Sequence, residues 1–166
     1  MCGIVGGVTN FNITPLLIEG LNKLEYRGYD SSGLIVLSNN TFSRARSVGK
    51  VKNLEKNLND RNKKIIGNIG IAHTRWATHG EPSSLNAHPH ISKNSVSVVH
   101  NGIIENYIKL KNYQLSQGYI FDSETDTEVI AHAIDSQMNS SKTLIESVQK
   151  AVKSFEGSYG LGIMSS

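Results

Sequence analysis

The order of its apolar segments is the feature that most restricts how this chain can fold. Hydrophobic periodicity predicts strands at residues 2–8, 33–37, 41–46, 69–73, 95–100 and 158–166, and helices at residues 13–28, 105–118, 125–138 and 142–157. Hairpin-like strands and consecutive helices take the place of the regular strand–helix alternation that a parallel sheet requires. The sequence therefore predicts an α+β fold in which helices pack on antiparallel strands.

The first helix and the strand pair after it carry residues that mark their ends. Thr14 is expected to act as the N-cap, Pro15 suits the first turn, and Gly28 suits the end of the helix. Residues 38–40 include two consecutive asparagines, which tolerate the left-handed dihedral angles of a tight turn. These residues predict a hairpin soon after the first helix.

Composition indicates a single domain with a core of its own and argues against several classes of function. The 166 residues are 38% hydrophobic and 19% charged, as in an ordinary globular chain. Basic residues are mixed with acidic ones, and the densest basic stretches, 50–56 and 61–64, are interpreted as solvated faces and not as a nucleic-acid site. No apolar run approaches the roughly 18 residues of a membrane span. A single cysteine excludes an internal disulfide, and no secretion signal is recognised, so we expect a reducing, cytoplasmic setting.

Four segments are not explained by strand or helix patterns. They are CGIVG at 2–6, YRGYDSSG at 26–33, HTRWATHGEPSSLNAHPH at 73–90, and HNGIIEN at 100–106. The third holds four histidines and the only tryptophan, with no readable period. It is predicted to be a long loop that is either mobile or ordered by its own polar contacts.

Cys2 can combine a nucleophile and a base in one residue. If Met1 is removed, Cys2 carries a free α-amine, whose ordinary pKa of about 7.7 to 8 leaves part of it unprotonated near neutrality. The thiol can then pass its proton to that amine, through a relaying water, and attack a carbonyl as thiolate. The alternative is that Cys2 is a small buried hydrophobe at the start of a strand.

A thiolate that attacks an amide needs donors for the oxyanion that forms. Asn101 offers a side-chain amide, and Gly102 offers an unobstructed backbone N–H. An Asn-Gly pair is also a common hairpin turn, which is the structural alternative at this position.

An amino-acid substrate also needs partners for its two charged groups. Arg75 suits the α-carboxylate, because a guanidinium can donate two parallel hydrogen bonds to it. Asp126 suits the α-ammonium, although a role at the N-terminus of a helix is the alternative.

The four segments, together with SETDTEVIAH at 123–132, resemble the glutaminase domain of the glutamine–fructose-6-phosphate aminotransferase family. The resemblance runs through the whole chain in order. The wider group is the class II glutamine amidotransferases, and its N-terminal nucleophile hydrolase fold has two stacked antiparallel sheets between helical layers. Because the first motif is shared by the whole group, residues 25–30 and 73–82 carry the more specific likeness.

The resemblance implies roles for the residues around the nucleophile. Cys2 is implied to be the nucleophile with its α-amine as base, and Arg27 to order its surroundings. Asn101 and Gly102 are implied to form the oxyanion hole, and Gly102 also to receive the α-ammonium together with Asp126.

The loop after the fourth strand is implied to bind the rest of glutamine. Arg75 is expected to hold the α-carboxylate, with Thr78 and His79 helping to fix the substrate. Trp76 resembles the family's gate between the glutamine pocket and an ammonia channel.

The histidines raise the alternative of a metal site. His88 and His90 flank a proline, and other histidines could converge on them. The sequence has no further cysteine that could serve as a metal ligand. The family that this chain resembles needs no metal or other cofactor for glutamine hydrolysis. We therefore expect no cofactor, and interpret both histidines as loop-packing or pocket residues.

Residues 1–166 are expected to form one glutaminase domain that lacks its C-terminal part and the sugar-isomerase domains of the family. The strand around Ile163 is then expected to present an open edge. Glutamine is the expected ligand, and a separate sugar-isomerase chain or domain the expected partner. Three hypotheses stay open at this point. The chain is an active glutaminase that supplies ammonia for glucosamine 6-phosphate synthesis, an amidotransferase domain that serves another acceptor, or a non-catalytic remnant or binding module.

Overall fold

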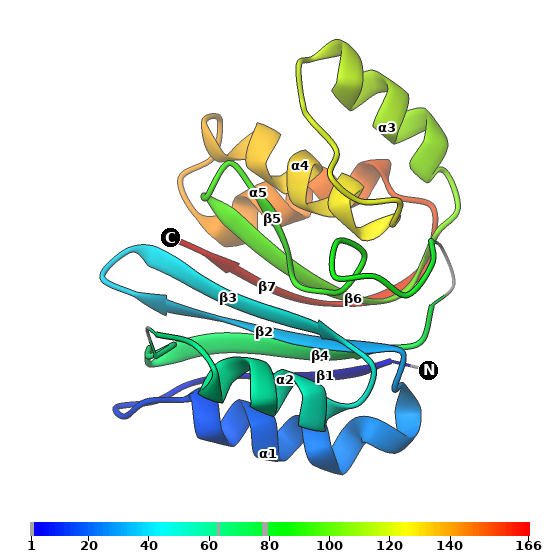
Figure 1. The fold of residues 1–166 in the computed structure, drawn as a ribbon. Helices are drawn as coiled ribbons and strands as arrows, with labels where there is room; N and C mark the ends of the chain where they lie inside the picture. The colour runs from blue at the N-terminus through cyan, green and yellow to red at the C-terminus, as the bar shows by residue number, and fades with distance from the viewer. Residues whose placement is uncertain (1, 63, 78–79) are drawn as a thin grey trace.

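Two antiparallel sheets lie face to face between helices, as Figure 1 shows. This computed structural model describes residues 2–62, 64–77 and 80–166. Helices α1 (Thr14–Leu24) and α2 (Val51–Asn59) cover the outer face of the four-stranded sheet, whereas α4 (Thr127–Met138) and α5 (Leu144–Ala151) cover the outer face of the three-stranded sheet. The layers therefore follow the order helix, sheet, sheet, helix that the resemblance implied.

The four-stranded sheet has the order β1-β4-β2-β3. Its strands are β1 (Gly3–Val8), β2 (Ser31–Ser38), β3 (Thr41–Val48) and β4 (Ile69–Arg75). The predicted hairpin is confirmed, because β2 pairs with β3 through Ser38 and Thr41, and Asn39 and Asn40 both have positive φ angles, 48° and 55°.

The three-stranded sheet has the order β5-β6-β7. Its strands are β5 (His90–Ser92), β6 (Val96–Ile104) and β7 (Gly157–Ser165). Within the described part of the chain β7 pairs with β6 alone, so Ile163 lies on an edge strand, as expected.

The predicted helices are present, with shorter bounds. They are α1 (Thr14–Leu24), α3 (Tyr107–Ser116), α4 (Thr127–Met138) and α5 (Leu144–Ala151), with 3-10 turns η1 (Glu25–Arg27) and η2 (Val152–Ser154). The predicted capping role of Thr14 is wrong. Ile13 occupies the N-cap position, and the Thr14 hydroxyl donates instead to the carbonyl oxygen of Ile65 at 3.0 Å. Across the described residues, no helix is long and apolar enough to cross a membrane.

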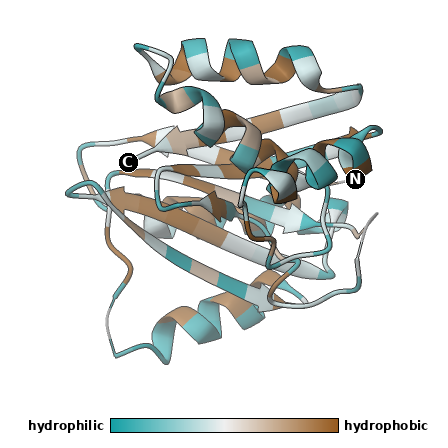
Figure 2. Ribbon diagram, turned by 90° about the horizontal axis from the view of Figure 1, so that it is seen from above, coloured by the Kyte–Doolittle hydropathy of each residue, from teal (hydrophilic) through white to brown (hydrophobic). Residues whose placement is uncertain are grey.

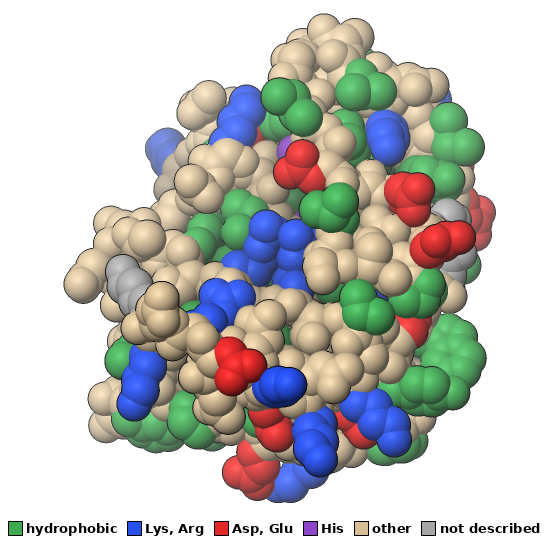
Figure 3. All heavy atoms as spheres, in the orientation of Figure 1, with side chains coloured by type: hydrophobic (Ala, Val, Ile, Leu, Met, Phe, Trp, Pro, Cys, Tyr) green, Lys and Arg blue, Asp and Glu red, His purple; other side chains and the backbone are tan. Residues whose placement is uncertain are grey.

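Helix α2 (Val51–Asn59) was not predicted from the sequence. Only its Val51 and Leu54 are buried, so its apolar stripe is too narrow to stand out among basic and polar residues. The basic stretch 50–56 does present charged side chains to solvent, but it does so as a helix that packs on β3. Figure 3 shows acidic and basic side chains interspersed over this part of the surface.

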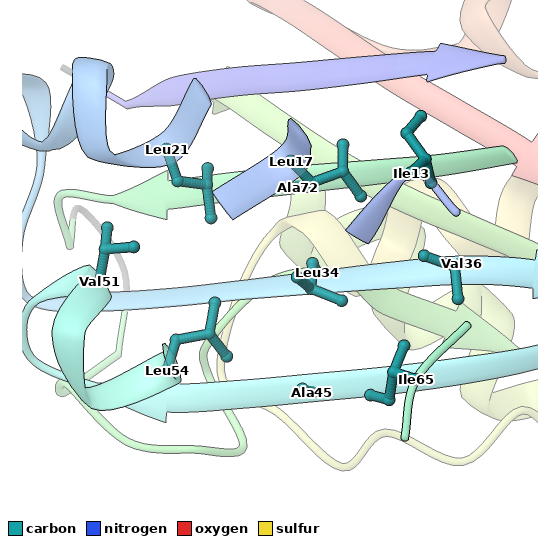
Figure 4. Close-up of a cluster of buried hydrophobic side chains, with 10 residues drawn as sticks. All are labelled: Ile13, Leu17, Leu21, Leu34, Val36, Ala45, Val51, Leu54, Ile65 and Ala72. Atoms are coloured by element: carbon teal, nitrogen blue, oxygen red, sulfur yellow. The ribbon is translucent and has the colours of Figure 1, made fainter. Parts of the chain in front are cut away.

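Three groups of buried apolar side chains hold the layers together. One lies between the four-stranded sheet and α1 and α2 (Figure 4), a second between the three-stranded sheet and α4 and α5, and the third between the sheets. The third group contains Ile35 and Ile71 from one sheet and Val99 and Met164 from the other. Apolar residues accordingly concentrate along the strands in Figure 2.

The first core gives a direct test of the fold. Leu17 of α1 is fully buried, whereas its neighbour Leu16 is 42% exposed. Leu17→Ala should lower the free energy of unfolding by about 2–5 kcal/mol, because it leaves a cavity. Leu16→Ala, the matched control, should change it by about 0.5 kcal/mol or less. Urea denaturation of both variants measures this, and equal losses would contradict the packing of α1.

Candidate active site

Six residues with a predicted catalytic or glutamine-binding role line one cavity of about 250 Å³, and His88, interpreted as a loop-packing or pocket residue, lines it as well. The six come from the start of β1, the end of β4, the middle of β6 and the start of α4: Cys2, Arg75, Trp76, Asn101, Gly102 and Asp126. Residues from both sheets therefore meet at this cavity, although they lie up to 124 positions apart in the chain.

Cys2 stands directly before β1 and is held by backbone and side-chain contacts. Its Sγ accepts a hydrogen bond from the backbone N–H of Trp76 at 3.3 Å, and its own backbone N–H donates to Oδ1 of Asn101 at 3.4 Å. Cys2 is only half-buried and faces the cavity. This position does not match a hydrophobe that opens a strand.

Burial raises the pKa of the Cys2 thiol. The hydrogen bond from Trp76 opposes the shift, because it stabilises the thiolate, and the positive charge of Arg75 acts in the same direction. The negative charge of Asp30 adds to the rise. The thiol is therefore mostly protonated near neutral pH and needs a base before it can attack.

Arg27 ends the η1 turn close to Cys2. Its Nε donates to the Cys2 carbonyl oxygen at 3.4 Å. The same turn is fixed to α2, because Oε2 of Glu25 accepts from the backbone N–H of Val51 at 2.7 Å. Arg27 thus connects the nucleophile to the α1–α2 side of the molecule.

Asn101 and Gly102 lie inside β6, opposite Gly160 and Tyr159 of β7, so the hairpin-turn interpretation is wrong. Among the described residues the Asn101 Nδ2 group donates no hydrogen bond, which leaves it as a donor toward the cavity. Gly102 has φ 142°, and a Cβ added there would lie 2.1 Å from the carbonyl oxygen of Ser158. Only glycine fits this strand position.

Arg75 and Trp76 extend from the end of β4 into the cavity. Arg75 is 3% exposed, and its Nη2 donates to the carbonyl oxygen of Gly80 at 3.2 Å. Burial lowers its pKa, and nearby carboxylates, Asp30 first among them, oppose that shift. The Trp76 ring is 49% exposed and packs edge-on against Tyr29 at a centroid distance of 5.5 Å.

Asp126 occupies the N-cap position of α4, yet its side chain makes no capping hydrogen bond there. Its Oδ2 accepts instead from the backbone N–H of Ile104 at 2.8 Å, which ties the start of α4 to β6. The carboxylate is 4% exposed and lines the cavity. Asp126 therefore lies at the N-terminus of a helix, as the alternative expected, but its side chain bonds to β6 instead of capping α4.

Two residues of the predicted glutamine site, Thr78 and His79, lie outside the described residues. Their neighbours on both sides are described, and the chain before them is anchored by Asp30. Oδ2 of Asp30 accepts a very short hydrogen bond from the backbone N–H of Ala77, and its Oδ1 accepts from the Ser31 hydroxyl at 3.0 Å. Sequence analysis missed this role, although Asp30 belongs to the segment 26–33.

Three histidines of segment 73–90 pack together, and one of them, His88, lines the cavity. The rings of His73 and His88 lie 4.2 Å apart, and those of His88 and His90 lie 5.0 Å apart. Burial lowers the pKa of His73 to about 3, and those of His88 and His90 well below the ordinary value. Considering only the residues that are described, no group of three or more His, Cys, Asp or Glu side chains is placed to hold a metal ion.

The chain is similar to known proteins in sequence and in fold. A family model described as the glutamine amidotransferase domain matches residues 73–166. The chain belongs to the glutamine amidotransferase domain family.

Curated relatives give a narrower likeness. The glutamine–fructose-6-phosphate aminotransferase (isomerizing) of Haemophilus influenzae is 52% identical over 167 residues, which cover 100% of this chain and 27% of that protein. The enzyme of the same name from Acinetobacter baylyi is 54% identical over 164 residues, which cover 99% of this chain and 26% of that protein. The chain thus spans about a quarter of the length of these relatives.

Two solved structures share the fold. Glutamine phosphoribosylpyrophosphate amidotransferase from B. subtilis, complexed with ADP and GMP, gives a TM-score of 0.80 at 26% identity, over 99% of this chain and 34% of that one. A structure described as the allosteric regulatory enzyme of purine biosynthesis gives 0.82 at 28% identity, over 98% and 35%. They confirm the predicted fold class, that of the N-terminal nucleophile amidotransferases.

The raised pKa of Cys2 predicts how its alkylation depends on pH. Because the thiolate is the reactive form, the rate of iodoacetamide labelling should reach its midpoint at a higher pH in the folded chain than in the urea-unfolded chain. Cys2 is the only cysteine, so mass spectrometry reports on this thiol alone. A lower midpoint in the folded chain would contradict the effect of burial.

Proposed function

We propose that this chain is a glutaminase that hydrolyses the side-chain amide of glutamine with Cys2 as nucleophile. The observation that carries the proposal is the single cavity shared by Cys2, the Asn101–Gly102 strand segment, Arg75 and Asp126. A thiol, an amide donor, a cation and an anion are the groups that an amino acid with a terminal amide requires. The close family likeness supports the same conclusion.

The reaction begins with proton transfer from the Cys2 thiol. Once Met1 is removed, the α-amine of Cys2 takes this proton through a water, and Sγ attacks the amide carbon. The C–N bond then breaks, the leaving nitrogen takes the proton, and ammonia departs from a γ-glutamyl thioester. Water activated by the same amine attacks the thioester, which releases glutamate and restores the thiol.

The oxyanion of each tetrahedral intermediate needs donors that are already in place. Nδ2 of Asn101 and the backbone N–H of Gly102 supply them, in our proposal, from one rigid strand. The hydrogen bond from Cys2 N–H to Oδ1 of Asn101 at 3.4 Å turns the Nδ2 end of that amide away from the α-amine. The packing of β1 against β6 therefore sets the distance between Cys2 and these donors.

Glutamine is bound through the opposite charges of Arg75 and Asp126. Arg75 holds the α-carboxylate, with Thr78 and His79 assisting from the same loop, and Asp126 with Gly102 receives the α-ammonium. Trp76, half-exposed at the mouth, covers the bound substrate and faces the exit for ammonia. Arg27 orders the backbone at Cys2.

The ammonia serves, in our proposal, an aminotransferase reaction on fructose 6-phosphate that yields glucosamine 6-phosphate. The names of the curated relatives and their greater length support this assignment. The chain then represents the glutaminase domain, residues 1–166, and works in the cytoplasm with a sugar-isomerase chain or domain. No cofactor takes part in the glutaminase steps.

Two substitutions separate binding from chemistry. Asn101→Ala should reduce kcat for glutamate release by about 100- to 1,000-fold with little change in KM, because the oxyanion exists only during the reaction. Arg75→Ala should chiefly raise KM, because the carboxylate is charged throughout. Steady-state kinetics measures both, with Arg61→Ala as an exposed control outside the cavity.

An unchanged kcat in Asn101→Ala would place the oxyanion hole elsewhere. A wild-type chain that folds, lacks Met1 and releases no glutamate would instead support the binding-module hypothesis for this chain.

Retention of Met1 gives an independent test. An acylated amine is no longer a base and adds bulk beside the thiol, so a chain that keeps Met1 should be inactive although Cys2 is present. Intact mass spectrometry of the active fraction reports which form carries activity. Full activity with Met1 attached would exclude the terminal-amine mechanism.

A further inference from the structure

Three buried histidines and Thr127 form a closed ring of hydrogen bonds at the cavity, which His88, His100 and Thr127 line. Nε2 of His73 lies 2.8 Å from the carbonyl oxygen of His100, and Nδ1 of His100 lies 3.0 Å from the Thr127 hydroxyl. The hydroxyl lies 2.9 Å from Nε2 of His88, and Nδ1 of His88 lies 3.3 Å from Nε2 of His73. All four residues are at most 5% exposed.

We propose that this ring has a single hydrogen-bond direction, and that the Thr127 hydroxyl within it is a positioning group for the glutamine site. The inference rests on the proposed function and extends it to residues that do not carry out the chemistry.

The carbonyl oxygen of His100 determines the direction in which the hydrogen bonds of the ring run. A carbonyl oxygen can only accept, so Nε2 of His73 must carry a proton. Nδ1 of His88 lies next to this N–H group and must therefore be unprotonated. The proton of the neutral His88 ring is then on Nε2, which donates to the Thr127 hydroxyl. Within the described residues the Thr127 hydroxyl has only His88 and His100 as hydrogen-bond partners, so its own proton goes to Nδ1 of His100; accepting from both rings would leave this buried proton unpaired. The neutral tautomers of all three histidines are therefore fixed, each with its proton on Nε2.

The ring joins the elements that carry the substrate-binding groups. His73 lies two positions before Arg75 on β4, His100 directly precedes Asn101 on β6, and Thr127 directly follows Asp126 on α4. A shift of any one element relative to the others breaks a ring hydrogen bond in a buried site, which is costly. The ring therefore holds the cation, the oxyanion donor and the anion at fixed separations.

His88, the fourth member, is itself fixed from both sides. Arg46 Nη1 donates to the carbonyl oxygen of Ala87, and Arg44 Nη1 donates to that of Pro89, at 3.0 and 3.2 Å. A Cβ added to Gly33 of β2 would lie 2.1 Å from the carbonyl oxygen of His88, so glycine permits this close approach. The ring thus rests on the four-stranded sheet.

The buried setting keeps two members of the ring uncharged. Burial lowers the pKa of both His73 and His88, so neither carries a proton charge near pH 7. If His100 were also protonated at Nδ1, Thr127 could no longer donate to this nitrogen. The hydrogen bond between them would then run in the opposite direction. His100 lies 3.8 Å from Asp126, so a neutral His100 leaves the Asp126 charge to the substrate ammonium.

Thr127→Val keeps the shape of the side chain and removes the hydroxyl, whereas Thr127→Ser keeps the hydroxyl. Thr127→Val should lower kcat for glutamate release by about 10- to 100-fold through misplacement of the reacting groups, and Thr127→Ser should restore most of it. Ser92→Ala is the matched control, because it removes an equally buried hydroxyl that lies 2.8 Å from Nδ1 of His132, outside the cavity. It should leave kcat unchanged.

Long-range ¹H–¹⁵N spectra of the ligand-free chain test the ring without any activity. The wild type should show His73, His88 and His100 protonated on Nε2, and Thr127→Val should shift the signals of His88 and His100 but not of His132. A proton on Nδ1 of any of the three would overturn the proposed direction, whether or not the wild type releases glutamate. An equal loss of kcat in Thr127→Ser, or in Ser92→Ala, would overturn the positioning role. A wild type without glutamate release but with the expected spectra would reject the proposed function and leave the ring supported.

Discussion

The packing of one sheet on the other creates the candidate site, because Cys2, the proposed nucleophile, and Asn101, the proposed oxyanion donor, are carried by different sheets. Cys2 precedes an outer strand of the four-stranded sheet, and Asn101 lies in the central strand of the three-stranded sheet. The contact at 3.4 Å between them depends on the apolar layer that includes Ile71 and Val99. Side chains in that layer are close-packed, so their volumes set the depth of the cavity above them.

Two carboxylates then hold the backbone around the cavity in place. Half-buried Asp30 anchors the backbone after Trp76, and buried Asp126 anchors the start of α4 to β6. Each carboxylate accepts a hydrogen bond from a backbone N–H, which offsets the cost of removing it from water. Acidic side chains thus tie neighbouring elements together, and both lie in segments singled out from the sequence, 26–33 and 123–132.

Much of the fold could be predicted from residues that are adjacent in the sequence. The predictions that were wrong or missing have physical causes. Two asparagines fixed the β2–β3 turn, and periodicity located α4, because in both cases the signal lies in adjacent residues. Helix α2 was missed because its stability depends on two buried side chains and on packing against β3. Asn101–Gly102 resembles a turn locally, yet its pairing with β7 comes from residues almost 60 positions away. The ring around Thr127 was likewise invisible, since its four members are joined only by tertiary structure.

The central claim is that Cys2 carries the γ-glutamyl group during turnover. Rapid acid quenching of the Met1-free chain with glutamine, followed by peptide mass spectrometry, measures this most directly. The proposed mechanism predicts a peptide that contains Cys2 and is heavier by one γ-glutamyl group, bound as a thioester that hydroxylamine removes. Release of glutamate without this adduct, or from a Cys2→Ala chain, would contradict it.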